Sequence, residues 1–144
     1  MVNEEFDGWE LSWPVRCYMA VTGIGLAVLL GTAAWLTPNP SGNGTHQQLG
    51  LPECTFKRVY DLPCPSCGMT TSWSHVMRGE LPSAVRCNSG GTFLALLALG
   101  VAPWLLLMAW RGRTFQRHPS DPQCGFTAIA IVVVTLIDWF VRIS

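Results

Sequence analysis

Charged side chains are scarce in this chain of 144 residues. Only 12% of the residues are Asp, Glu, Lys or Arg, whereas soluble domains carry roughly 25%. The nine basic and nine acidic side chains cancel, so the chain lacks the basic excess that a nucleic-acid partner requires. Hydrophobic residues make up 49%, and the mean hydropathy is +0.31. This composition indicates a small membrane protein of one domain, with the lipid bilayer as its main partner.

The sequence also lacks the patterns that are typical of catalytic sites. It has no Ser/His/Asp order, no glycine-rich phosphate loop and no paired carboxylates in a polar segment. The acids of the longest polar stretch, Glu53, Asp61 and Glu80, are scattered along it. No catalytic residue is therefore predicted, and an enzymatic role is not favoured.

Three apolar runs are long enough to cross a lipid bilayer as helices. A hydrocarbon core about 30 Å thick takes roughly 20 helical residues, and a lone segment in lipid must be helical to satisfy its own backbone groups. We therefore predict an all-α integral membrane protein with transmembrane helices over residues 17–36, 92–110 and 126–142. Residues 1–16 form an N-terminal tail, and residues 111–125 form the short loop between the last two helices.

The orientation follows from the arginines that flank the predicted spans. Arg111, Arg113 and Arg117 cluster just after the second span, and cytoplasmic loops carry an excess of Lys and Arg. Because this loop and the N-terminus would share one side, we expect a cytoplasmic N-terminus. The first loop and the C-terminus are then expected outside the cytoplasm.

The first loop divides into two parts. Residues 37–53 are rich in Pro, Gly and Asn, which predicts a flexible linker. Residues 54–91 are the cysteine-rich part, in which helical spacing predicts a short amphipathic helix along the membrane interface. The apolar face of that helix carries Met69, Trp73, Val76 and Met77, and its polar face carries Thr70, Thr71, Ser74, His75 and Arg78. A second short helix is expected from Leu81 to Cys87, with Pro82 in its first turn.

The cysteine-rich part has a specific arrangement of residues. Its members are Cys54, then the run Cys64, Pro65, Ser66, Cys67, Gly68, Met69 and Thr70, then Gly79, Ala84 and Asn88 ahead of an apolar run. This arrangement, from Cys54 to Trp110, resembles a bacterial family of small membrane proteins that carries the motif C-P-x-C-G-[LM]-T and is a domain of unknown function. Family members often have Arg where this chain has Thr71, and Pro where it has Ser89. The resemblance implies a bacterial inner membrane but no established activity.

The four cysteines of the loop allow three interpretations. A structural disulfide would join Cys54 to Cys64 or Cys67 and anchor the loop of an accessory membrane component, which is the interpretation the sequence favours. A thiol-disulfide redox site would use the Cys64–Cys67 pair, because a helix that follows such a pair stabilises a thiolate. Cysteines at membrane helix ends can also act beside a quinone, but the sequence identifies no quinone pocket.

The third interpretation is a zinc site, the one cofactor the sequence suggests. Zinc takes four ligands in a tetrahedron, and we predict Cys54, Cys64, Cys67 and Cys87 as its ligands. His75 is excluded because eight residues of helix place it about 12 Å from Cys67. Another membrane protein is a possible partner in each interpretation.

One acidic residue lies inside an apolar run. Asp138 falls near the end of the third predicted span, and acids within membrane segments often have functional roles. Arg142 follows one helical turn later, so an i,i+4 ion pair between them is predicted. A proton or partner site at Asp138 is the alternative.

Overall fold

The computed structural model describes the backbone of residues 9–114 and 121–143, and within these ranges it leaves out the side chains of residues 9, 114, 121–128 and 130. The described chain is helical, as predicted, apart from one short strand pair. Its α-helices are α1 (Trp13–Trp35), α2 (Thr55–Tyr60), α3 (Met69–Met77), α4 (Leu81–Cys87), α5 (Ser89–Arg111) and α6 (Asp121–Ile143), and η1 (Thr45–Leu49) is a 3-10 helix. Strands β1 (Trp9–Glu10) and β2 (Arg113–Thr114) pair antiparallel, with Trp9 opposite Thr114.

Two helices of the described chain, not three, are long and apolar enough to cross a membrane: α1 and α5. The third predicted span lies within α6, much of whose first half falls outside the described side chains. Both apolar helices begin earlier than predicted. Pro14 sits in the first turn of α1, where its missing N–H costs nothing, and Asn88 caps α5 by accepting a hydrogen bond from the Gly91 N–H (2.7 Å).

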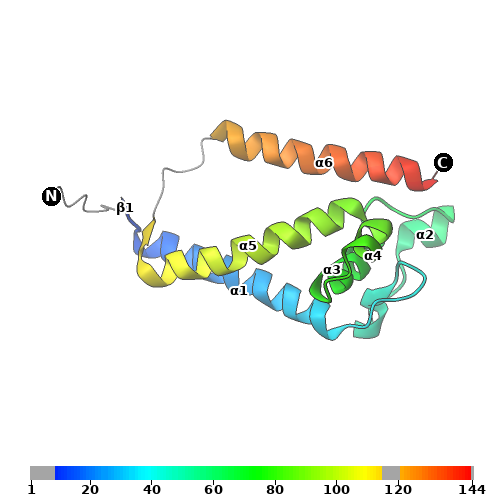
Figure 1. The fold of residues 1–144 in the computed structure, drawn as a ribbon, viewed down its shortest axis with the longest axis horizontal. Coiled ribbons are helices and arrows are strands. Elements are labelled where there is room, and N and C mark those ends of the chain that lie inside the picture. The colour runs from blue at the N-terminus through cyan, green and yellow to red at the C-terminus, as the bar shows by residue number, and fades with distance from the viewer. Residues whose placement is uncertain (1–8, 115–120, 144) are drawn as a thin grey trace.

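Helices α1 and α5 run antiparallel and diverge from the end that carries the strand pair, and α3 and α4 fill the opening (Figure 1). The buried core lies where these helices meet. One cluster joins Leu30 of α1 to Ala98 and Ala102 of α5, and a second joins Val76, Ala84 and Ala95. Trp73 of α3 packs against both clusters, so α3 is wedged into the fold.

The surroundings of α3 correct the prediction of a helix lying along an interface. Thr71 and Ser74, expected on a polar face, are fully buried, as is Ser72. The hydroxyl of Thr71 shares a 2.7 Å hydrogen bond with Thr45, and that of Ser72 shares one of 2.9 Å with Thr92 of α5. The small hydroxyl side chains let neighbouring segments approach α3 from several sides.

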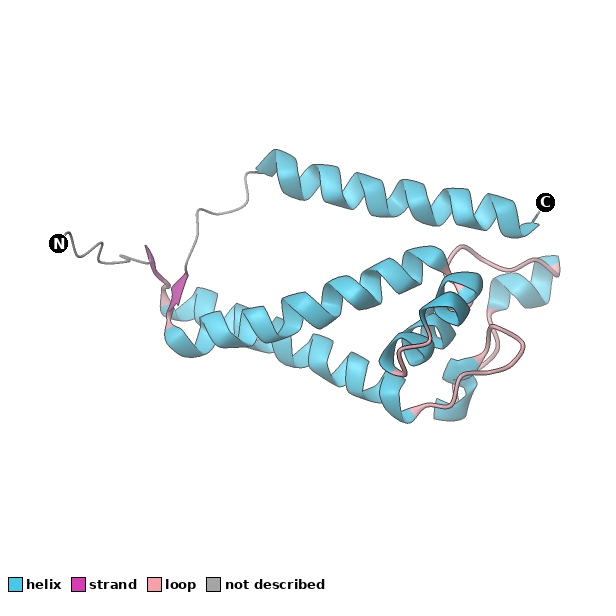
Figure 2. Cartoon of the chain, viewed as in Figure 1, coloured by secondary structure: helices cyan, strands magenta, loops and turns pink. Residues whose placement is uncertain are grey.

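The predicted linker, residues 37–53, is likewise more structured than expected. It contains η1 and the fully buried Thr45, whose hydroxyl also accepts a hydrogen bond from the backbone N–H of Asn39 (3.0 Å). The turns on either side of η1 use glycines with positive φ angles, Gly44 and Gly50. Figure 2 shows this loop segment folded back beside the cysteine-rich part.

Candidate functional site

Three cysteines form a cluster at the open end of the α1–α5 pair. The Sγ atoms of Cys54, Cys64 and Cys67 all lie within 4.8 Å of one another. The thiol of Cys64 donates to the Cys67 sulfur at 3.2 Å, and the Cys64 backbone N–H donates to the same sulfur at 3.2 Å. We call these three residues the thiol cluster.

The thiol cluster contains no disulfide, so the predicted structural disulfide between Cys54 and Cys64 or Cys67 is wrong. All three cysteines are free thiols, and the 3.2 Å contact between two of them is well above the 2.03–2.05 Å of an S–S bond. The loop is held instead by hydrogen bonds to its backbone, which the cysteine spacing does not reveal.

Local structure explains how the cysteines converge. Cys54 is the residue just before α2, and Cys64 and Cys67 flank a tight turn in which the Cys67 N–H donates to the Cys64 carbonyl (3.0 Å). Gly68 then adopts a φ angle of +85° and starts α3. The turn places the two sulfurs on one side, against the start of α2.

Two side chains from distant segments hold this turn. Asn88 donates to the carbonyls of Pro65 (3.0 Å) and Cys67 (3.1 Å). Arg142 of α6 donates to the same two carbonyls, at 3.2 Å and 2.9 Å. Because each carbonyl has two lone pairs, it accepts both donors. Asn88 and Arg142 are therefore positioning residues for the thiol cluster.

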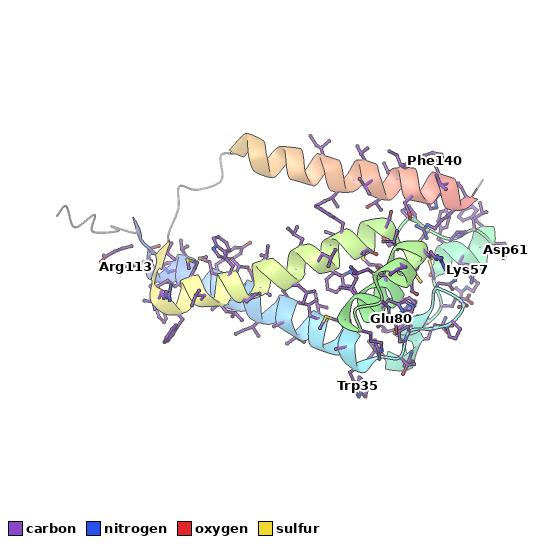
Figure 3. All side chains as sticks on the ribbon, in the orientation of Figure 1. Trp35, Lys57, Asp61, Glu80, Arg113 and Phe140 are labelled. Atoms are coloured by element: carbon purple, nitrogen blue, oxygen red, sulfur yellow. The ribbon has the colours of Figure 1, made fainter. Side chains whose placement is uncertain are left out.

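Helix α6 ends over the cysteine-rich part. Arg142 forms a 2.8 Å ion pair with Asp138 one turn earlier, and the Trp139 indole N–H donates to the Pro63 carbonyl at 2.6 Å. The labelled Phe140 near the end of α6 lies on the same side of the molecule as Lys57 and Asp61 of the α2 segment (Figure 3). The sequence indicated the ion pair but not that Arg142 reaches the cysteine turn.

The remaining cysteines do not join the cluster. Cys87 ends α4 and is absent from the group of three sulfurs, with its thiol near Gly42 instead. Cys17 lies on α1, and the side chain of Cys124 is outside the described residues. His75 pairs with Glu80 at 2.6 Å. The structure therefore assembles three of the four predicted zinc ligands.

The surroundings of the cysteines in this part of the chain shift their thiol pKa values in opposite directions. The pKa of Cys54 is lowered, chiefly because the backbone N–H of Lys57, in the first turn of α2, stabilises the thiolate. Burial raises the pKa of Cys67 to about 12, and the hydrogen bond with Cys64 adds to that rise. Burial also raises the pKa of Cys87, opposed by the positive charge of Arg142. Cys54 therefore becomes a nucleophile at a lower pH than Cys67 does.

This order of acidity predicts an order of alkylation. At about pH 7.5, iodoacetamide should modify Cys54 more than about tenfold faster than Cys67, since each unit of pKa difference changes the thiolate fraction about tenfold. Cys67 should gain reactivity only as the pH approaches its pKa of about 12. Mass spectrometry of time points measures both rates, and faster modification of Cys67 would contradict the assignment.

A cavity of about 170 Å³ opens onto the thiol cluster. Its wall includes all three cysteines and three titratable side chains from the neighbouring segments, His46, Glu53 and Lys57. Lys57 and Glu53 lie 3.8 Å apart as an ion pair. His46 carries no signal in the sequence, because it lies within a stretch that predicts a linker and has no spacing relation to the cysteines.

The family described as "Protein of unknown function (DUF2752)" matches residues 54–102, which hold the thiol cluster, α3, α4 and the first part of α5. The chain is thus similar to that family over its cysteine-rich part and the helix that follows. No curated protein and no solved structure matches the chain.

Proposed function

We propose that this chain is an integral membrane protein that carries out thiol–disulfide exchange at its thiol cluster. The observation that supports the proposal is the convergence of three free sulfurs within 4.8 Å, two of them 3.2 Å apart. A disulfide between Cys64 and Cys67 needs a movement of only about 1.2 Å to reach bonding distance. A third thiol, Cys54, lies within reach of both.

The lowered pKa of Cys54 and the raised pKa of Cys67 assign the first attack to Cys54. In reduction of a substrate disulfide, the Cys54 thiolate attacks one substrate sulfur, and the other leaves as a thiolate that takes up a proton. Cys64 then attacks the mixed disulfide, releases the second substrate thiol and leaves a Cys54–Cys64 disulfide, which Cys67 can exchange into Cys64–Cys67. Run in reverse, the same steps oxidise a substrate dithiol. Partner proteins with exposed cysteines are the proposed substrates.

The placement in a membrane rests on the surfaces of the helices. Large apolar side chains on α1 are more than half exposed, among them Tyr18 (74%), Val21 (71%), Ile24 (55%) and Val28 (60%). A row of this kind is costly in water and favourable in lipid. We propose that α6 is the third span, since it is as long as α1 and α5 and lies alongside α5 (Figure 1).

The orientation is proposed from the two ends of the helices. Arg16, Arg111 and Arg113 lie at the end with the strand pair, where Arg16 donates to the Ala109 carbonyl (3.1 Å). We place this end in the cytoplasm of a bacterial cell, because basic residues favour that side. The thiol cluster at the opposite end then faces an oxidising compartment. A membrane-impermeant maleimide should therefore label Cys54 in intact cells, and labelling only after cell lysis would reverse the orientation.

A redox titration tests the exchange activity. The purified full chain in detergent is equilibrated in glutathione buffers, and remaining thiols are tagged with a heavy maleimide. We expect two cluster thiols to disappear together, with a midpoint between about −270 and −120 mV, the range of catalytic dithiols. Cys64→Ser should abolish the Cys64–Cys67 pair, whereas Cys87→Ser, a cysteine outside the cluster, should leave the midpoint unchanged. Three thiols that stay tagged at every potential would contradict the proposal and leave a purely structural role.

Metal binding is the second candidate, favoured by the same convergence of three sulfurs. Sulfurs held by one zinc ion at Zn–S distances of about 2.3 Å lie about 3.8 Å apart, within the 4.8 Å limit of the cluster. Cys54, Cys64 and Cys67 would hold the ion as thiolates, and a fourth ligand would come from water or a cavity residue. Stoichiometric zinc in the purified protein, lost in Cys64→Ser but not in Cys87→Ser, would favour this candidate over exchange.

A further inference from the structure

A second cavity, of about 280 Å³, lies next to the thiol cluster. Its wall is mainly apolar and comes from the last turns of α1, from η1 and the residues after it, and from α3. The lining residues that matter here are Leu36, His46, Leu49, Met69, Thr70 and Trp73. No Asp, Glu, Lys or Arg is among the described residues that line it. The cavity therefore suits an uncharged, largely apolar ligand.

The two cavities share part of their walls. His46, Met69 and Thr70 line both the apolar cavity and the cavity that opens onto the thiol cluster. Cys67 lies two residues before Met69 in the chain. A ligand in the apolar cavity thus contacts residues that also line the cavity of the thiols.

The position of the cavity also indicates which kind of ligand can reach it. Its α1 wall is the loop end of an apolar helix of 23 residues, one of the two long enough to cross a membrane. The exposed side chain of Trp35, which is typical of a membrane–water boundary, lies at the same end (Figure 3). If α1 spans the membrane, a lipid-soluble molecule can enter the cavity directly from the bilayer.

The cavity wall also carries polar groups that can hydrogen-bond to a carbonyl compound. Trp73 offers an aromatic surface, and His46 and Thr70 place an imidazole and a hydroxyl at the wall shared with the thiols. Apolar walls with a few polar groups that fix orientation are typical of small-molecule sites, whose volumes begin at about 300 Å³. A single substituted ring with ring carbonyls matches both the size and the chemistry of this cavity.

We infer that the apolar cavity binds the head group of a lipid-soluble quinone, which oxidises the thiol cluster. This inference rests on the proposed thiol–disulfide exchange and names its electron acceptor. In the reaction, the S–H bonds of Cys64 and Cys67 break and an S–S bond forms. Two electrons and two protons pass to the quinone, whose two carbonyls become the hydroxyls of a hydroquinone. Thiols of a partner protein then reduce the cluster again through Cys54.

The test uses the reduced full chain in detergent and decylubiquinone, a fully substituted benzoquinone that leaves no ring carbon for lasting addition of a thiol. We expect loss of quinone absorbance in parallel with loss of two cluster thiols. Leu49→Lys places an ammonium group at the apolar cavity and should slow the reaction about tenfold, because desolvating a charge is costly. Leu81→Lys is the matched control, since Leu81 is as exposed as Leu49 (44% each) but does not line the cavity.

Diamide, a soluble thiol oxidant, distinguishes a failure of quinone binding from a failure of thiol–disulfide exchange. If diamide forms the cluster disulfide but decylubiquinone is not reduced, the quinone inference is overturned and the exchange function stands. If neither oxidant forms a cluster disulfide, both fail. Equal rates for Leu49→Lys and the unmodified chain would overturn the assignment to this cavity, provided diamide oxidises both equally.

Discussion

Replacing Gly68 with alanine should strongly destabilise the cysteine-rich part. Gly68 has a φ angle of +85°, and a Cβ at this position would lie 2.5 Å from the Cys87 carbonyl oxygen and 2.8 Å from that of Gly42. Both neighbours are backbone atoms, so neither can rotate away. The left-handed conformation and the overlap together should lower the free energy of unfolding by about 3 kcal/mol.

A matched substitution isolates the steric part of this effect. Gly79 has a similar φ angle, +75°, but a Cβ there would have nothing within 4 Å. Gly79→Ala should therefore cost only about 1 kcal/mol, the penalty of the left-handed conformation. Thermal unfolding in detergent, followed by tryptophan fluorescence, measures both. Equal midpoints for the two variants would show that the Gly68 backbone does not pack against the end of α4.

The second large effect is expected for Asn88→Ala. Asn88 is fully buried, caps α5 through the Gly91 N–H, and donates to the carbonyls of Pro65 and Cys67. Loss of a cap costs about 1 kcal/mol, and each of the two lost hydrogen bonds, to carbonyls that keep Arg142 as a donor, costs about 1 kcal/mol more. We expect a total loss of about 3 kcal/mol and faster alkylation of Cys67, because the turn that buries its thiol is released.

Asn88→Ser separates the two roles of this residue. Serine is as good a helix cap as asparagine, but its hydroxyl cannot reach both carbonyls of the turn. The variant should recover about 1 kcal/mol of stability while Cys67 stays more reactive than in the unmodified chain. If serine restores the slow alkylation of Cys67, the amide of Asn88 does not hold the turn.

The long apolar helices could be predicted from sequence because lipid and core select for the same residue types over many positions. The residues at which these helices begin could not be predicted in this way. The uncharged apolar run predicts that the second span starts at Thr92, although α5 begins at Ser89 and includes Gly90 and Gly91, which disfavour a helix by intrinsic propensity. In the structure both glycines are helical: Asn88 caps α5 through the Gly91 N–H, and the missing side chains leave room for Thr135 of α6 beside Gly90 and for Met69 beside Gly91. Tertiary packing overrides propensity here.

The candidate site was predictable in part. The two-residue spacing of Cys64 and Cys67 allows a single tight turn to bring their sulfurs together, as the structure has it. Whether Cys54 or Cys87 joins them depends on tertiary contacts, and the close approach of Gly68 to the Cys87 carbonyl leaves the Cys87 thiol on the side of Gly42. The sequence contains no periodic pattern that would predict such a contact.

The residues that hold the thiol cluster in place were the hardest to predict from the sequence. Arg142 was assigned to an ion pair with Asp138, which accounts for its charge but not for its bonds to the Pro65 and Cys67 carbonyls, 77 and 75 residues away in sequence. Thr45 and Thr71 form a buried hydroxyl pair, yet each is an ordinary polar residue in the sequence. Single hydrogen bonds between distant segments leave no pattern in one sequence.

The most direct measurement for the thiol cluster is a map of the disulfide that forms in the purified protein after one equivalent of diamide. Peptides are separated without reduction, and linked pairs are identified by mass spectrometry. A single linkage within Cys54, Cys64 and Cys67, with Cys17 and Cys87 free, is the predicted result. A linkage through Cys87 or Cys17, or one between two chains, would contradict the convergence of three sulfurs on which the proposed chemistry depends.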